Sequence, residues 1–232
     1  MAISKIGSNA VDTLSSKLTL TAADGVEDND YIMELTNAEA TDGRSYGLRV
    51  KAGSTSADQS FVVQDHDASN TLFKITGDGA VTKPSQPSIS VDGSSSSVVT
   101  DSGSASYLVT QWTTGNDSSF YSQGITYDSS NGRFTVPVAG KYLINVSIYT
   151  YQNNVFQRVQ LYINGSNNLH FSFDNKTGDG DLGQDNNLSG STIFNLSAND
   201  YISVHMYKVS SESNKRYYFG PGHSSFSMHL LS

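Results

Sequence analysis

The chain has 232 residues and a formal net charge of −8, with 14 Lys and Arg against 22 Asp and Glu. This balance argues against nucleic acid as a partner, because a nucleic-acid binder normally presents a basic face. The absence of cysteine excludes disulfides, thiolate nucleophiles and cysteine-based metal centres. With 13 Tyr, 10 Phe and many turn-forming residues, the composition favours strands over helices and predicts an all-β fold.

Residues 1–17 form a short and mostly polar leader. They contain no apolar stretch of the length that a signal peptide needs, and the chain has no run long enough to cross a bilayer. We therefore expect synthesis in a cytoplasm and no membrane insertion. Two interpretations of the leader remain open: a frayed terminus, or an anchor that orders only against a partner.

Residues 18–83 consist of short alternating runs bounded by turn sequences such as Asp42-Gly43 and Gly77-Asp78-Gly79. Each run carries so few apolar residues that one copy could hardly bury a core, which suggests that several chains share it. We predict a trimeric β shaft here, with a small independent β domain as the alternative. The stretch from Gly47 to Val81 resembles the β-stranded shafts of bacteriophage tail and head fibres.

Pro84 and Pro87 mark a linker, and residues 84–232 form a separate head. Short strands with polar turns between them predict a β-sandwich or jelly roll. The clearest alternating segments are Lys141–Tyr151, Gln157–Ile163, Tyr201–Lys208 and Ser225–Leu231.

Several motifs of the head resemble the signature of the complement C1q globular head, a member of the C1q/tumour necrosis factor superfamily. The longest is Tyr127-Asp-x-x-x-Gly132-x-Phe134-x-Val136-Pro-x-x-Gly140-x-Tyr142, and Leu161-Tyr-Ile-Asn-Gly165 and Asn199-Asp-Tyr-Ile-Ser-Val204 follow in order. The chain lacks the collagen stalk, cysteines and secretory signal of the animal members, which argues against a complement-like role.

The resemblance implies a homotrimer. In this superfamily the strands that match Lys141–Tyr151, Tyr201–Lys208 and Ser225–Leu231 are expected in one sheet, whose outer face packs around a threefold axis. The outward residues of these strands are too aromatic to remain in water on a monomer. The predicted subunit interface therefore comprises Leu143, Tyr149, Tyr151, Tyr201, His205, Tyr207 and His229. Because burial disfavours charged histidine, we expect the trimer to weaken as the pH falls towards about 5.

The loop from Asp174 to Asn187 is acidic and has almost no apolar residue, as is typical of recognition loops. Its candidate receptor-binding residues are Asp174, Asn175, Asp179, Asp181 and Asp185. The carboxylates of Asp179, Asp181 and Asp185 also suit calcium. The spacing differs from that of an EF-hand and lacks its closing Glu, which favours the alternative of a solvated loop without metal.

The sequence shows no catalytic constellation. The five histidines lack metal-ligand spacing, and neither a Gly-x-Ser-x-Gly elbow nor a placed carboxylate pair occurs. We expect no enzyme activity and no cofactor apart from the candidate calcium.

Three functions remain open. The first is a trimeric bacteriophage fibre or spike: residues 1–17 dock on other virion proteins, the shaft projects, and the head binds a host-surface glycan or protein. The second is a capsid decoration (cement) protein that stabilises the head lattice with the same trimer. The third is a secreted C1q-like lectin, which the leader disfavours. We expect the protein in the virion.

Overall fold

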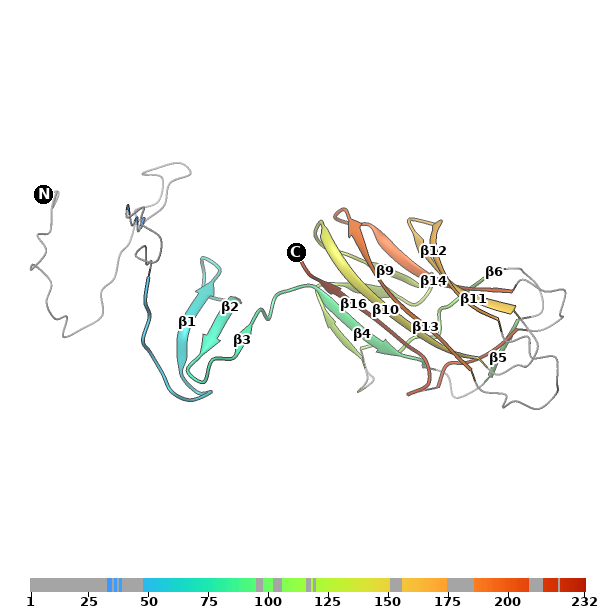
Figure 1. Cartoon of the computed structure of the whole chain (residues 1–232), viewed down its shortest axis with the longest axis horizontal. Helices are drawn as coiled ribbons and strands as arrows, with labels where there is room; N and C mark the ends of the chain where they lie inside the picture. Colours follow the sequence, from blue (N-terminus) through green and yellow to red (C-terminus); the bar gives the residue numbers. More distant parts are fainter. Residues whose placement is uncertain are drawn as a thin grey trace, which may run out of the picture. The chain divides into compact units, whose positions relative to one another are not determined.

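The computed structural model describes Met33, Glu34, Thr36 and Ala38, and residues 48–94, 98–101, 106–115, 118, 120–150, 156–174, 186–208, 215–220 and 222–232. The chain divides into two compact units, Met1–Lys51 and Ala52–Ser232. Every regular element among the described residues is a β-strand and lies in the second unit (Figure 1). The predicted all-β class is confirmed.

Three antiparallel strands precede the linker in a small sheet of order β1-β2-β3. Their bounds are β1 Gln59–Gln64, β2 Thr71–Thr76 and β3 Val81–Thr82. Asp65 closes the turn between β1 and β2, since its carboxylate accepts hydrogen bonds from the Asn70 backbone N–H at 3.0 Å and from Asn70 Nδ2 at 2.6 Å. These bonds lower the pKa of Asp65 to about 2.

The head is a sandwich of two antiparallel sheets. The seven-stranded sheet has the order β5-β15-β10-β16-β4-β7, and β13 pairs with β10. The six-stranded sheet has the order β12-β11-β14-β9-β8, and β6 pairs with β14. The strands of the first sheet are β4 Ser88–Asp92, β5 Val98–Asp101, β7 Tyr121–Gln123, β10 Gly140–Thr150, β13 Asn186–Leu196, β15 Lys215–Tyr218 and β16 Ser225–Leu230. Those of the second are β6 Ser106–Leu108, β8 Thr126–Asp128, β9 Arg133–Thr135, β11 Phe156–Ile163, β12 Ser166–Asp174 and β14 Tyr201–Lys208.

The core between the sheets is built from the inward residues of the alternating strands. The ring of Phe134 stacks on that of Phe226, with centroids 4.1 Å apart, and on that of Tyr127 at 4.6 Å. Burial raises the pKa of Tyr127 to about 12, and its hydroxyl donates to the Thr110 carbonyl at 2.7 Å. Trp112 packs edge-on against Phe134 at 6.3 Å. The aromatic residues of the longest sequence motif are therefore core residues.

The polypeptide enters and leaves the head at the same end of the sandwich. Gln86 donates its side-chain amide to the Leu230 carbonyl, and the Leu230 N–H donates to the Pro87 carbonyl at 2.9 Å. The Lys141 N–H donates to the Ser232 carbonyl at 2.8 Å. The start of β10 thus lies beside the linker, and the end of β10, about 33 Å away for a strand of this length, marks the opposite end.

Candidate functional site

The strands predicted to share one sheet are divided between the two sheets. β10 and β16 pair in the seven-stranded sheet, where Leu143 lies opposite His229. β14 lies in the six-stranded sheet, between β11 on one side and β9 and β6 on the other. The prediction of one common sheet is therefore wrong. Alternation identifies the inward and outward residues of a strand, but it does not identify the strand beside it.

This division separates the predicted interface residues into two groups. Leu143, Tyr149 and His229 lie on the outward face of the seven-stranded sheet, which we call the assembly face. Tyr201, His205 and Tyr207 lie on the outward face of the six-stranded sheet, on the other side of the sandwich. Tyr151 lies outside the described residues.

The assembly face is organised in rows across β13, β10 and β16. In the first row Leu143 lies between His229 and Ile193, and the Ile193 side chain is 54% exposed. In the next row Asn145 Nδ2 donates to Ser227 Oγ at 3.2 Å, while Ser191 Oγ donates to Asn145 Oδ1 at 2.6 Å. The side-chain amide of Asn145 thereby connects β13, β10 and β16, and both its nitrogen and its oxygen already have a hydrogen-bond partner.

The rows continue with a second hydrogen bond and then an aromatic cluster. Ser147 Oγ donates to Asn187 Oδ1 at 2.7 Å. Beyond it the ring of Tyr149 packs edge-on against those of His223 at 5.0 Å and Tyr218 at 6.1 Å. Ser224, which is fully buried, fixes this end because its hydroxyl accepts from the Tyr149 N–H at 3.0 Å and donates to the Tyr218 carbonyl at 2.8 Å.

The centre of the assembly face carries no charged residue. Between the rows of Leu143 and Tyr149, the outward positions of the three described strands hold only apolar, hydroxyl, amide, tyrosine and histidine side chains. They are Leu143, Asn145, Ser147, Tyr149, Asn187, Ser189, Ser191, Ile193, Ser225, Ser227 and His229. The charged Lys141 and Asp92 lie at its margins.

The outward face of the six-stranded sheet has a different chemistry. His205 stacks on Tyr162 with ring centroids 3.9 Å apart, and the hydroxyls of Ser106 and Ser203 lie 3.2 Å from its Nδ1 and Nε2. This burial lowers the pKa of His205 to about 4. The guanidinium carbon of Arg133 lies 4.2 Å from the ring centroid of Tyr201, a cation–π contact. This face therefore carries a charge, and the rings of Tyr162, Tyr201 and His205 have partners within the chain.

The acidic recognition loop falls largely beyond the described residues. Asp174 is the last residue of β12 and Asn186 the first of β13. Asn175, Asp179, Asp181 and Asp185, and with them the candidate calcium site, lie outside the described residues. In the part of the chain that the structure describes, no three His, Asp or Glu side chains cluster as metal ligands. The described residues also contain no helix long and apolar enough to span a membrane.

Sequence reasoning missed several residues of the assembly face. Asn145, Ser191 and Ser227 are joined only when three strands distant in sequence come into register. Ile193 lies between the motifs Leu161–Gly165 and Asn199–Val204 and belongs to neither. The one available signal was the alternation in Lys141–Tyr151, where Asn145 and Ser147 share a side with Leu143 and Tyr149.

Comparison with known proteins agrees with this architecture. The profile of the C1q domain matches residues 104–231, more than half of the chain. The chain belongs to the C1q domain family. Among solved structures, its fold is similar to that of the tumour necrosis factor Eiger from S. frugiperda, at 14% identity over 63% of this chain and 94% of that one, with a TM-score of 0.45. Murine APRIL at pH 8.0 is similar at 13% identity over 63% and 99%, with a TM-score of 0.46. No curated protein matches the chain.

Proposed function

We propose that this C1q-family chain is a non-catalytic, homotrimeric structural protein of a bacteriophage virion, a fibre or spike whose C1q domain binds a host surface. The observation that carries the homotrimer is the uncharged assembly face. C1q and tumour necrosis factor domains form a trimeric fold family, so an assembly face is expected on one of the two sheets.

The seven-stranded sheet suits that role better than the six-stranded one. Interface cores are depleted in charged residues, and the central rows of the assembly face hold no Asp, Glu, Lys or Arg. Asn145 and Ser147 are already hydrogen-bonded within the subunit, so covering them leaves few unsatisfied polar atoms. Ile193, largely exposed on a single chain, gains the most from being covered.

The strand register supports recognition at the end of the head away from the linker. Gly140 of β10 pairs with Leu196 of β13 near the linker, and Thr150 pairs with Asn186 at the other end. Asp174 pairs with Phe156, which follows Thr150 by six residues, so both residues that flank the segment 175–185 lie towards that far end. A loop in this place is available to a host glycan or protein when the shaft side is attached to the virion.

Two features support the placement in a virion. The stretch Gly47–Val81 resembles phage fibre shafts, and the described part of that stretch forms the short strands of the small sheet. The capsid decoration role, the alternative, uses the same trimer. Electron microscopy of labelled virions separates the two, because a fibre projects from the particle and a cement protein covers lattice junctions; a protein missing from virions contradicts both.

The homotrimer is tested by light scattering on the purified full chain. Three copies of 24.9 kDa predict a mass of 74.7 kDa. Leu143→Asp should dissociate the trimer, because an unpaired charge in a dry interface costs about 3–5 kcal/mol per site. Tyr207→Asp, on the six-stranded sheet, is the matched control and should remain trimeric. A wild-type mass of 24.9 kDa contradicts the proposal, and dissociation by Tyr207→Asp alone moves the interface to the other sheet.

A further inference from the structure

One face of the small three-stranded sheet carries a cluster of five apolar side chains. Residues paired across antiparallel strands point to the same side, and the register pairs Phe61 with Ile75, Val63 with Phe73, and Ile75 with Val81. We call these five residues, Phe61, Val63, Phe73, Ile75 and Val81, the apolar face. Phe61, Val63 and Val81 are 41%, 39% and 58% exposed, so nothing in the described chain covers them fully.

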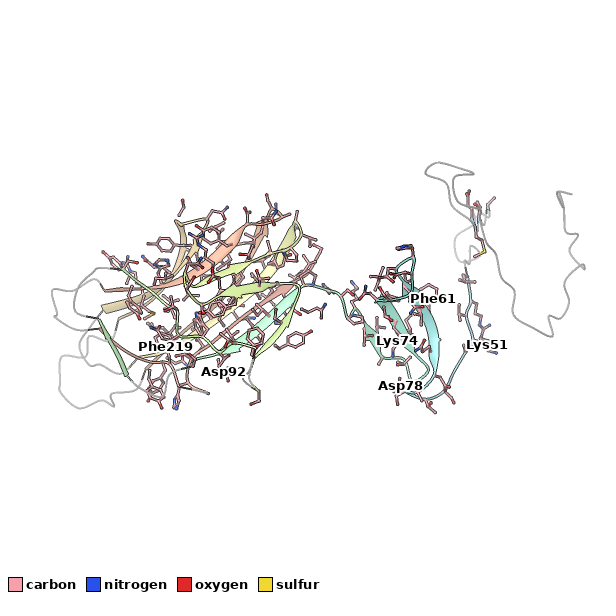
Figure 2. All side chains as sticks on the ribbon, turned by 180° about the vertical axis from the view of Figure 1, so that it is seen from behind. Lys51, Phe61, Lys74, Asp78, Asp92 and Phe219 are labelled. Carbon is pink, nitrogen blue, oxygen red and sulfur yellow. The ribbon has the colours of Figure 1, made fainter. Side chains whose placement is uncertain are left out.

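The opposite face of the same sheet is mixed and carries a charge. Val62 pairs with Lys74, and Lys74 pairs with Thr82 (Figure 2 labels Phe61 and Lys74). On the apolar face, by contrast, the main internal support is an edge-on contact between Phe61 and Phe73, with centroids 6.1 Å apart. A three-stranded sheet needs a packed hydrophobic face to be stable, so the apolar face requires an occupant.

We propose that two further copies of this chain are that occupant, so that the three small sheets of a trimer share one core around the threefold axis. This inference rests on the proposed homotrimer of the C1q domain. The five linker residues 83–87 span at most about 18 Å when fully extended, and Pro87 is fixed to the head by its hydrogen bond from Leu230. Trimeric heads would therefore hold the three sheets at high effective concentration.

The chemistry of the apolar face also favours identical partners. Around a threefold axis every side chain meets its own copies, and charged residues there would repel one another. All five side chains of the face are uncharged and lack polar atoms, so their copies can meet without that cost. The face equally lacks polar or charged groups that would select a foreign protein.

The test uses the absence of native cysteine, which gives one thiol per chain in a single-cysteine variant. Val63→Cys places the thiol on the apolar face, and Val62→Cys, one residue away, places it on the opposite face. In the full-length protein under mild oxidation, we expect Val63→Cys to form a linked pair of 49.8 kDa, two copies of 24.9 kDa, on a non-reducing gel. It should form about tenfold faster or more than with Val62→Cys, because only thiols on the apolar face would be held close to their copies in the shared core.

The outcomes separate this inference from the proposed function. A trimeric mass by light scattering together with selective cross-linking at Val63→Cys supports both. A trimeric mass with equal or absent cross-linking at the two positions overturns the shared core and leaves the trimeric head standing. A monomeric wild-type mass overturns the proposed function and the shared core with it. Ile75→Cys is a second probe of the same face and keeps the test decisive if Val63→Cys folds poorly.

Discussion

His205 should make the stability of the head depend on pH. Its pKa is about 4 in the folded protein, because burial between Tyr162 and two serine hydroxyls disfavours the imidazolium, against 6.5 for the exposed side chain. Between these two values the unfolded chain binds more protons than the folded one. The free energy of unfolding therefore decreases as the pH falls from 6.5 towards 4. Well above pH 6.5 His205 is neutral in both states, and no stability is lost through it.

The magnitude follows from the two pKa values. At pH 5, proton linkage with pKa values of about 4 and 6.5 gives a loss of about 2 kcal/mol relative to neutral pH. His205 is only half-buried, so solvent screening reduces this roughly by half, to about 1 kcal/mol. For a domain of this size the corresponding change in melting temperature is about 2–4 °C.

The assay compares melting temperatures at pH 7.5 and pH 5.0. His205→Gln removes the titrating group and leaves an amide for the two serine hydroxyls. Its melting temperature should therefore fall less between pH 7.5 and pH 5.0 than that of the wild type, by about 2–4 °C. His66→Gln changes an exposed histidine and should behave as the wild type does. Equal pH dependence in wild type and His205→Gln would refute this account of the histidine.

The remaining three predictions concern the framework and the loop. Gly93→Ala should destabilise the head by about 2 kcal/mol or more, because the added Cβ would lie only 2.7 Å from the Phe219 Cα and closer still to its carbonyl. Gly115→Ala is the control, because among the described residues its Cβ would meet only Phe120, at 3.9 Å. Equal thermal unfolding of the two variants would contradict the close approach. Replacing Asp174–Asn187 with a short Gly/Ser loop should leave the melting temperature nearly unchanged and lower host attachment, and unchanged attachment would place the receptor site elsewhere. If the loop holds calcium, chelation should lower the melting temperature of the wild type but not of the Asp179→Asn, Asp181→Asn double variant.

Local patterning predicted the inward faces of the strands well. Tyr142, Ile144, Val146 and Ile148 alternate in the sequence, and all four are buried. Periodicity is a property of one strand, and burial on one side follows directly from it. The turn sequence Asn164-Gly165 is equally local: both residues have positive φ angles, 51° and 81°, as the tight turn between β11 and β12 requires.

The pairing of distant strands could not be predicted in the same way. Asn145 and Ser227 are 82 residues apart, and neither position carries a signal that names the other. The same limit explains why β14 was wrongly predicted to share a sheet with β10: its outward residues alternate as regularly as those of β10. The two histidines expected at one interface therefore lie on different sheets: His229 is on the assembly face, and His205 is on the six-stranded sheet. A pH effect through His205 acts on the stability of one subunit and not on the assembly face.

The edge of the seven-stranded sheet gives an independent reason for association. Among the described strands, β13 pairs with β10 alone, so its other side presents unpaired backbone groups along Asn186–Leu196. Free edges of this length are normally protected by charged residues or proline, since they otherwise template aggregation. β13 contains neither, and Ile193 is exposed on it. An unprotected edge is tolerable when neighbouring subunits cover it. If the proposed trimer brings β13 against a neighbouring subunit, the threefold symmetry covers this edge in every copy, whereas a monomer leaves it uncovered.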